Sequence, residues 1–214
     1  MSLTLHLHPL SSFCQKALIA FYENDTPFSP HLVDLGNATS AAAFKALWPI
    51  GKFPVLRDDA RDRTVPESTI IIEYLQQFYP GRTRFIPADP DLAWQVRLSD
   101  RFYDNYVHLP MQKIVGDKLR PAGASDPEGV AQARTQLETS YFMIEVEMRG
   151  RTWAAGDSFT LADCAAAPAL YFANLVQTFG AQKSVAAYFE RLLARPSFAR
   201  AVKEADPYRH LFPG

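Results

Sequence analysis

The chain has 214 residues, of which 48% are apolar and 21% charged, and its formal net charge is −1. This composition is ordinary for a globular protein of one or two domains. The balanced charge gives no overall field that would attract nucleic acid or an anionic membrane surface. We therefore expect neither nucleic acid nor membrane as a partner, and any anion must be recognised by a local site.

The first ten residues, MSLTLHLHPL, lack a basic region followed by a long apolar stretch, so they do not have the pattern of a signal peptide. The most apolar later run, CAAAPALYFA, is too short to cross a bilayer. The two cysteines, Cys14 and Cys164, lie far apart in the sequence, and a structural disulfide is not expected in a reducing compartment. We expect a cytoplasmic protein.

The first 80 residues alternate between strand and helix patterns. Residues 3–8, LTLHLH, alternate apolar and polar side chains, which predicts a strand. Apolar residues then recur at helical spacing from Cys14 to Phe21, and SPHLVDL predicts a second strand, parallel to the first. A hairpin from GKFPVLRDD to RDRTV and a helix over ESTIIIEYLQQFYP follow. These elements predict a small mixed sheet with helices.

The rest of the chain shows helical patterns only. The segment YPGRTRFIPADP is rich in proline, glycine and charge, which is typical of a linker. Four apolar-striped segments follow, and Pro110 is expected to kink or end the first of them. In FTLAD, Thr160 and Asp163 have the spacing of a capping box, which predicts a stabilising role and no chemistry.

Four stretches in this order resemble the cytosolic glutathione transferases of the serine type, with a bacterial-like pattern close to the theta, zeta and phi classes: HPLSSFCQKALIAFYE, WPIGKFPVL, VPESTIIIEYL and FTLADCAAAP. The resemblance covers nearly the whole length. It implies an α/β thioredoxin-like, glutathione-binding domain at residues 1–79, a linker at 80–90, and an all-α helical domain at 91–214 that contributes the electrophile site. It also implies a homodimer that uses glutathione as co-substrate and no metal.

The resemblance also implies a glutathione site. Lys52 would supply a cation for the glycyl carboxylate, and a cis peptide at Phe53–Pro54 would turn the Phe53 backbone towards the cysteinyl part of glutathione. Glu67 would meet the γ-glutamyl ammonium and Ser68 its carboxylate. Ser68 also suits an N-cap position, where free backbone N–H groups attract a carboxylate. From these two residues alone, a capped helix with a surface acid is the favoured interpretation of Glu67 and Ser68.

The segment SSFC offers three candidates for the chemistry. On the family pattern, the residue that hydrogen-bonds the glutathione sulfur falls on Ser11, with Ser12 as its rival. A thiolate near a helix N-terminus is stabilised, and the pKa of its thiol falls from about 8.5 towards neutrality. Cys14 shares an apolar stripe with Ala17, which favours packing over redox chemistry.

Further residues follow from the resemblance or are set aside. Leu10, Tyr106 and Met111 would line the electrophile pocket, with Tyr208 and Phe212 as its floor and lid, and Asp100 would reach the glutathione of a partner subunit. His6 and His8 share a strand face near His31, but zinc needs three or four ligands, so no metal site is expected.

A serine-type transferase of small hydrophobic electrophiles is predicted. The alternatives are a glutathione-dependent isomerase, a reductive dehalogenase or lyase, a Cys14-based thiol oxidoreductase, and a non-catalytic binding or regulatory protein of the same fold.

Overall fold

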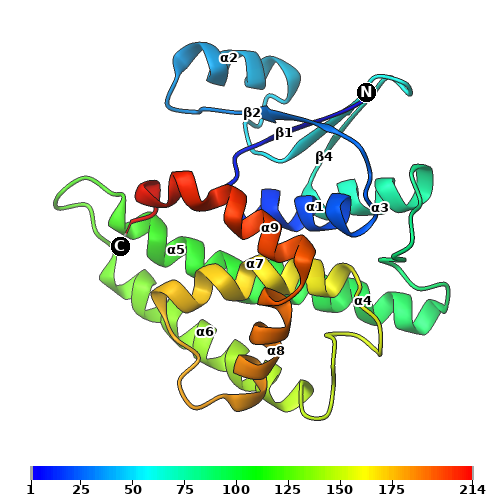
Figure 1. The fold of residues 1–214 in the computed structure, drawn as a ribbon. Coiled ribbons are helices and arrows are strands. Elements are labelled where there is room, and N and C mark those ends of the chain that lie inside the picture. Colours follow the sequence, from blue (N-terminus) through cyan, green and yellow to red (C-terminus); the bar gives the residue numbers. More distant parts are fainter. Residues whose placement is uncertain (1, 214) are drawn as a thin grey trace. The chain divides into compact units, whose positions relative to one another are not determined.

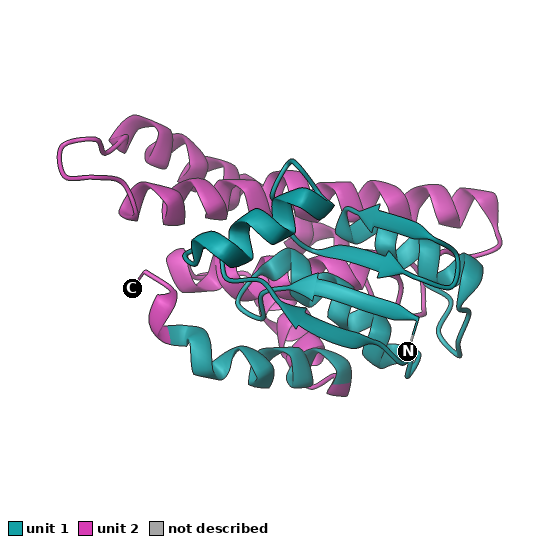
Figure 2. Ribbon diagram, turned by 90° about the horizontal axis from the view of Figure 1, so that it is seen from above, with its two compact units in different colours: residues 1–85, 197–209 teal, residues 86–196, 210–214 magenta. Residues whose placement is uncertain are grey.

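The computed structural model describes residues 2–213, which form two compact units (Figure 2). Unit 1 comprises the chain up to residue 85 together with residues 197–209, and unit 2 comprises residues 86–196 and the chain from residue 210. Helix α9 (Pro196–Ala205) therefore belongs almost entirely with the amino-terminal unit. The expected domain ranges 1–79 and 91–214 remain predictions.

Unit 1 is built on a four-stranded sheet, and the predicted strands are all present: β1 (Leu3–Leu7), β2 (Ser29–Leu32), β3 (Val55–Asp58) and β4 (Arg63–Pro66). The strand order is β2-β1-β3-β4, in which β1 and β2 are parallel and the other neighbours are antiparallel. His6 of β1 pairs with His31 of β2 and with Val55 of β3, so β1 is a central strand.

Helices cover both faces of this sheet (Figure 1). Helices α1 (Ser12–Glu23) and α3 (Ser68–Phe78) lie side by side on one face, and α2 (Ala38–Leu47) lies on the other. The alternation of β1 follows these layers: Leu3, Leu5 and Leu7 are buried, whereas the ring of His6 lies 6.2 Å from that of Phe44 in α2. The predicted thioredoxin-like arrangement is confirmed.

Helix α2 is absent from the sequence-based prediction. Its only fully buried residue is Phe44, so the segment has no apolar stripe that could mark it. Two other signals were available, namely its alanine content and Asn37, whose side-chain oxygen caps the helix by accepting hydrogen bonds from Thr39 N (3.0 Å) and Ser40 N (3.1 Å).

The carboxyl-terminal segment is tied to α1 by polar contacts within unit 1. The Ser197 hydroxyl donates to the buried carboxylate of Glu23 at 2.5 Å, and the Tyr22 hydroxyl donates to Glu204 at 2.5 Å. The Arg200 guanidinium lies 3.9 Å from the centroid of the Tyr22 ring, a cation–π contact. These contacts explain why residues 197–209 group with unit 1.

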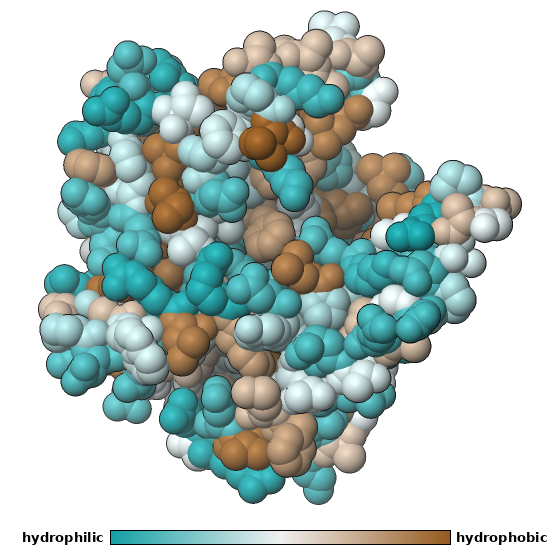
Figure 3. All heavy atoms as spheres, turned by 180° about the vertical axis from the view of Figure 1, so that it is seen from behind, coloured by the Kyte–Doolittle hydropathy of each residue, from teal (hydrophilic) through white to brown (hydrophobic). Residues whose placement is uncertain are grey.

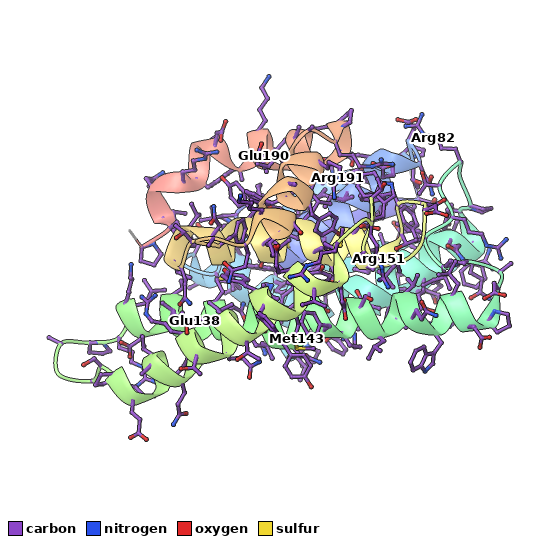
Figure 4. All side chains as sticks on the ribbon, turned by 90° about the horizontal axis from the view of Figure 1, so that it is seen from below. Arg82, Glu138, Met143, Arg151, Glu190 and Arg191 are labelled. Atoms are coloured by element: carbon purple, nitrogen blue, oxygen red, sulfur yellow. The ribbon has the colours of Figure 1, made fainter. Side chains whose placement is uncertain are left out.

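Unit 2 is all-helical, as predicted. Its helices are α4 (Pro90–Phe102), the π-helix η1 (Tyr103–His108), α5 (Leu109–Lys118), α6 (Pro127–Glu147), α7 (Leu161–Val176) and α8 (Lys183–Leu193). The 3-10 helix η2 (Asp206–Leu211) follows α9. Helix α8 is joined to the loop before α7 by Arg191, which donates to the carbonyl oxygens of Thr152 and Arg151 at 3.2 Å (Figure 4).

Pro110 was expected to kink or end the helix, and it does not end it, because α4, η1 and α5 follow one another without a break. Proline has no N–H, so the carbonyl four residues earlier, that of Tyr106, loses its usual partner. The Ser140 hydroxyl of α6 lies 2.7 Å from this carbonyl oxygen and hydrogen-bonds it. The change to a π-helical pattern just before Pro110 and this side-chain donor together let the helix continue.

Unit 2 leaves several large apolar side chains exposed on α4 and α6. Trp94 is 63% exposed and Phe142 62%. Leu98, Met143 and Val146 are exposed on the same two helices (Met143 is labelled in Figure 4). The space-filling view of one side of the molecule shows apolar side chains separated by hydrophilic ones (Figure 3).

Candidate functional site

Ser11 lies at the point where the first strand gives way to the first helix. Strand β1 ends at Leu7, and Ser11 is the N-cap residue of α1, with extended backbone angles (φ −80°, ψ 122°). Its backbone N–H donates to His8 O at 2.9 Å, and its hydroxyl oxygen accepts from Cys14 N at 3.4 Å. A serine hydroxyl that accepts a hydrogen bond still has a proton to donate. The half-buried Ser11 can therefore cap the helix and donate to a ligand atom.

Its neighbours are less accessible. Ser12, the first residue of α1, is only 6% exposed. Cys14 is fully buried, which confirms that it packs in the apolar stripe of α1. Burial raises the pKa of the Cys14 thiol to about 12, and hydrogen bonds with Ser11 and the His8 backbone offset only part of this effect. The thiol is therefore protonated at neutral pH, whereas a thiolate is the nucleophilic form of cysteine.

Glu67 and Ser68 form the start of α3. Glu67 occupies the N-cap position with φ +70°, and its side chain makes no capping hydrogen bond. A positive φ is unfavourable for a residue with a side chain, and such strained residues concentrate at functional sites. The prediction of Ser68 as the N-cap is wrong, because the turn at Glu67 makes Ser68 the first helical residue, where it is buried. Glu67 is exposed.

Lys52, Phe53 and Pro54 precede β3. The Phe53–Pro54 peptide bond is cis, as the resemblance implied. Phe53 is half-buried against the cluster of Val33, Phe44 and Val55, and the neighbouring Lys52 is exposed. The loop therefore has an apolar anchor beside a solvated cation.

Three polar residues near these segments were not among the predicted site residues. His8 lies one residue beyond β1, outside the strand on which it was placed, and its ring contacts those of Phe53 and Tyr208, with centroids 6.2 and 4.8 Å away. The Gln15 side chain donates to Pro9 O at 3.0 Å. The almost fully buried Lys16 donates to Thr69 Oγ1 at 2.9 Å, which links α1 to the first turn of α3. A lysine or glutamine inside an apolar helical stripe was the available signal, since such residues are seldom fully buried.

The remaining predicted residues are divided between the two units. Leu10 is half-buried in unit 1. In unit 2, Tyr106 is 50% exposed and Met111 is buried. Tyr208 contacts His8 in unit 1, whereas Phe212 packs on Phe172 in unit 2, with ring centroids 5.7 Å apart. An electrophile pocket shared by these residues stays a prediction.

Asp100 was predicted to reach a partner subunit. Its side chain is 1% exposed and accepts hydrogen bonds from Arg101 Nε at 2.9 Å and Nη2 at 2.6 Å. Arg101 also pairs with Asp104 at 2.6 Å. The carboxylate is therefore bound within its own chain, and its cross-subunit role stays a prediction.

The start of α7 has the predicted capping box. Asp163 Oδ2 accepts from Thr160 N at 2.9 Å, while Oδ1 accepts from Ala154 N at 2.9 Å and from the Tyr188 hydroxyl at 2.6 Å. Burial raises the pKa of Asp163, and the hydrogen bonds it accepts oppose this shift. Every one of these partners belongs to the protein, in keeping with a structural role.

Within residues 2–213, no group of three or more His, Cys, Asp or Glu side chains is placed to hold a metal ion. The ring centroids of His6 and His31 are 4.6 Å apart, which makes a pair on adjacent strands. Over the same part of the chain, none of the helices has the length and apolar character needed to cross a membrane.

Comparisons with known proteins agree with this architecture. Residues 5–83 match the family described as glutathione S-transferase, N-terminal domain, and residues 102–196 match glutathione S-transferase, C-terminal domain. The chain is 31% identical to glutathione S-transferase 3 of Zea mays over 210 residues, which cover 94% of this chain and 93% of that protein. It is 26% identical to the stringent starvation protein A homolog of Histophilus somni, over 96% of this chain and 92% of that protein.

Among solved structures, a glutathione S-transferase from Methylobacterium radiotolerans in complex with glutathione sulfonate superposes with a TM-score of 0.82. The two chains are 25% identical, and the match covers 94% of each. The two matched families and this structure agree with the fold described above, and the plant relative is more than 30% identical over almost the whole chain. The chain belongs to the glutathione S-transferase family.

Proposed function

We propose that the protein is a glutathione transferase in which Ser11 stabilises the thiolate of bound glutathione. The observation that carries the proposal is the position of Ser11, half-buried at the N-terminus of α1 with a hydroxyl proton available for donation. Backbone N–H groups at this end of the helix add positive potential. The thiolate then attacks a small hydrophobic electrophile, and proximity together with electrostatic stabilisation supplies most of the acceleration.

The rest of glutathione is held by the segments that precede β3 and begin α3. Lys52 meets the glycyl carboxylate, the backbone at Phe53 and Pro54 pairs with the cysteinyl residue, and Glu67 and Ser68 receive the γ-glutamyl end. Support comes from the start of α3, where the Glu67 side chain makes no capping hydrogen bond and Glu67 has a positive φ. A helix N-terminus favours a carboxylate ligand.

The same thiolate would serve an isomerase, a reductive dehalogenase or a lyase, so the electrophile must be found by experiment. The oxidoreductase alternative loses support, because Cys14 is buried and its thiol has a pKa of about 12. Calorimetry with glutathione, followed by assays with aryl halides, enones, peroxides and disulfides, tests the proposal. Absence of glutathione binding at millimolar concentration would favour a non-catalytic role for the fold.

The protein is further proposed to act as a homodimer, because twofold pairing is the commonest assembly and α4 and α6 expose large apolar side chains such as Trp94 and Phe142. Sedimentation should give twice the mass of one chain. The dimer of a Trp94→Glu variant should dissociate at micromolar concentration. A Trp153→Glu variant is not a suitable control, because the Trp153 ring packs against Phe159 and Arg195 inside unit 2 and the change would disturb the fold. A monomer at every concentration contradicts the proposal.

A further inference from the structure

Three hydrogen bonds hold the turn that leads into Ser11. Ser11 N donates to His8 O at 2.9 Å, Leu10 N donates to His8 Nδ1 at 3.3 Å, and Gln15 Nε2 donates to Pro9 O at 3.0 Å. His8 takes part in two of these bonds, through its backbone and its side chain. No role has yet been assigned to its imidazole.

The Leu10 bond requires one form of the ring. A nitrogen that accepts a hydrogen bond carries no proton, so the imidazole is neutral with its proton on Nε2, a tautomer assigned here from the hydrogen bond. An imidazolium has N–H donors at both nitrogens and cannot accept from Leu10. Protonation of His8 therefore removes one of the bonds that hold the turn.

The surroundings of His8 favour this neutral form. Its ring stacks on Phe53, with an interplanar angle of 24°, and meets the edge of Tyr208, so contacts from two other segments fix its orientation. Burial lowers the pKa of His8, while the charge of Asp34 acts in the opposite sense without reversing the shift. Tyr208 is the titratable side chain in ring contact with it, and Lys52 adjoins Phe53 in the chain.

We propose that His8 is a positioning residue whose neutral imidazole holds the Leu10–Ser11 turn and joins it to Phe53. The inference rests on the proposed function, since it gives the turn the task of aiming the Ser11 hydroxyl at the glutathione sulfur. His8 itself need not touch glutathione. The backbone that binds the cysteinyl residue and the hydroxyl that binds its sulfur would then be held in register by one side chain.

Two isosteric variants separate the hydrogen bond from the ring. In His8→Asn the amide oxygen takes nearly the place of Nδ1 and keeps the acceptor, whereas in His8→Gln the carbonyl lies one bond further out and the acceptor at this place is lost. In His8→Gln the thiol pKa of bound glutathione should rise by about one unit, a tenfold change in the thiol–thiolate equilibrium constant, while glutathione affinity changes less than about threefold. His8→Asn should recover most of the thiolate.

The pH profile adds a second readout. The thiolate fraction of bound glutathione is measured as a function of pH. In the wild type, it should fall more steeply than a single titrating thiol as the pH drops through the pKa of His8, because protonation of His8 also releases the turn. The His8→Asn complex should follow the curve of a single thiol. A structural role alone would change stability without this difference. Equal thiol pKa values in the wild type and both variants, or an equal rise in both variants, would overturn the proposal.

Two measurements on the unliganded protein keep this test separate from the proposed function. Nitrogen NMR of His8 should show an unprotonated Nδ1 at neutral pH, and the Leu10 amide should exchange with solvent faster in His8→Gln than in His8→Asn. A protonated Nδ1, or equal exchange in both variants, would contradict the proposed role of His8 in holding the turn, even if glutathione binds. Failure of the wild type to bind glutathione would instead contradict the proposed function, and the exchange of the Leu10 amide would still decide whether His8 holds the turn.

Discussion

Two helix N-termini in this protein are built in opposite ways. At the start of α7, Thr160 and Asp163 form a complete capping box that is buried and satisfied by protein groups. At the start of α3, Glu67 stands in the cap position with a positive φ and makes no side-chain capping bond. Both helices have a polar residue near the start, but only α7 has the capping-box spacing in its sequence, and the backbone geometry adds the positive φ at Glu67. A helix start completed by its own chain serves stability, and one left open and strained is suited to a ligand.

The largest expected effect is on stability, at the start of α7, where the capping box is complete. Asp163→Ala would leave Thr160 N, Ala154 N and the Tyr188 hydroxyl without their acceptor in a buried region. Each unsatisfied buried group costs about 1–3 kcal/mol, so the free energy of unfolding should fall by about 3 kcal/mol or more. Chemical denaturation measures this loss. The glutathione affinity of the folded fraction should stay within about threefold of the wild type, and a selective loss of binding would show that Asp163 belongs to the site.

At the start of α3, where Glu67 makes no capping bond, a substitution should weaken glutathione binding. Glu67→Ala removes the carboxylate while keeping a β-carbon at φ +70°. Loss of a hydrogen bond to a charged group costs about 1.5–3 kcal/mol, so calorimetry should show glutathione affinity about ten- to a hundredfold weaker. Unchanged affinity would remove Glu67 from the site.

Glu67→Gly is the matched control for strain. It also lacks the carboxylate, so its affinity should fall as far as that of Glu67→Ala. Glycine adopts positive φ without steric cost, and the glycine variant should be more stable than the alanine variant by about 1 kcal/mol. Equal stability of the two variants would mean that no strain is stored at this cap.

The smallest effect belongs to Thr160→Ala, which removes one capping side chain and keeps Asp163. The free energy of unfolding should fall by about 1 kcal/mol, with glutathione affinity unchanged. Thermal unfolding with and without glutathione separates the two quantities. If Thr160→Ala weakened glutathione binding more than it lowered stability, the start of α7 would also have a binding role, and the contrast with α3 would fail.

Much of the fold could be predicted because its signals are local. The alternation in β1, the apolar stripe of α1 and the capping spacing at Thr160 each lie within a few residues. Helix α2 escaped because it buries only Phe44, and the continuation past Pro110 depends on Ser140, which lies 30 residues further along the chain.

The candidate site was predictable only in part. Ser11, Glu67 and Ser68 stand in recognisable motifs, but whether Ser68 or Glu67 caps α3 depends on one backbone angle that the sequence does not reveal. The contacts of His8 with Phe53 and Tyr208 join segments 45 and 200 residues away in the chain. Such contacts exist only once the sheet and the carboxyl-terminal segment have assembled.

Ser11, rather than Ser12 or Cys14, is proposed to stabilise the glutathione thiolate. The most direct measurement is the thiol pKa of bound glutathione, titrated by thiolate absorbance in the wild type and in Ser11→Ala, Ser12→Ala and Cys14→Ala. One hydrogen bond to a charged sulfur is worth about 1.5–3 kcal/mol, so only Ser11→Ala should raise this pKa, by about one to two units, with glutathione affinity nearly intact. A rise in Ser12→Ala in place of Ser11→Ala, or loss of activity confined to Cys14→Ala, would contradict the account.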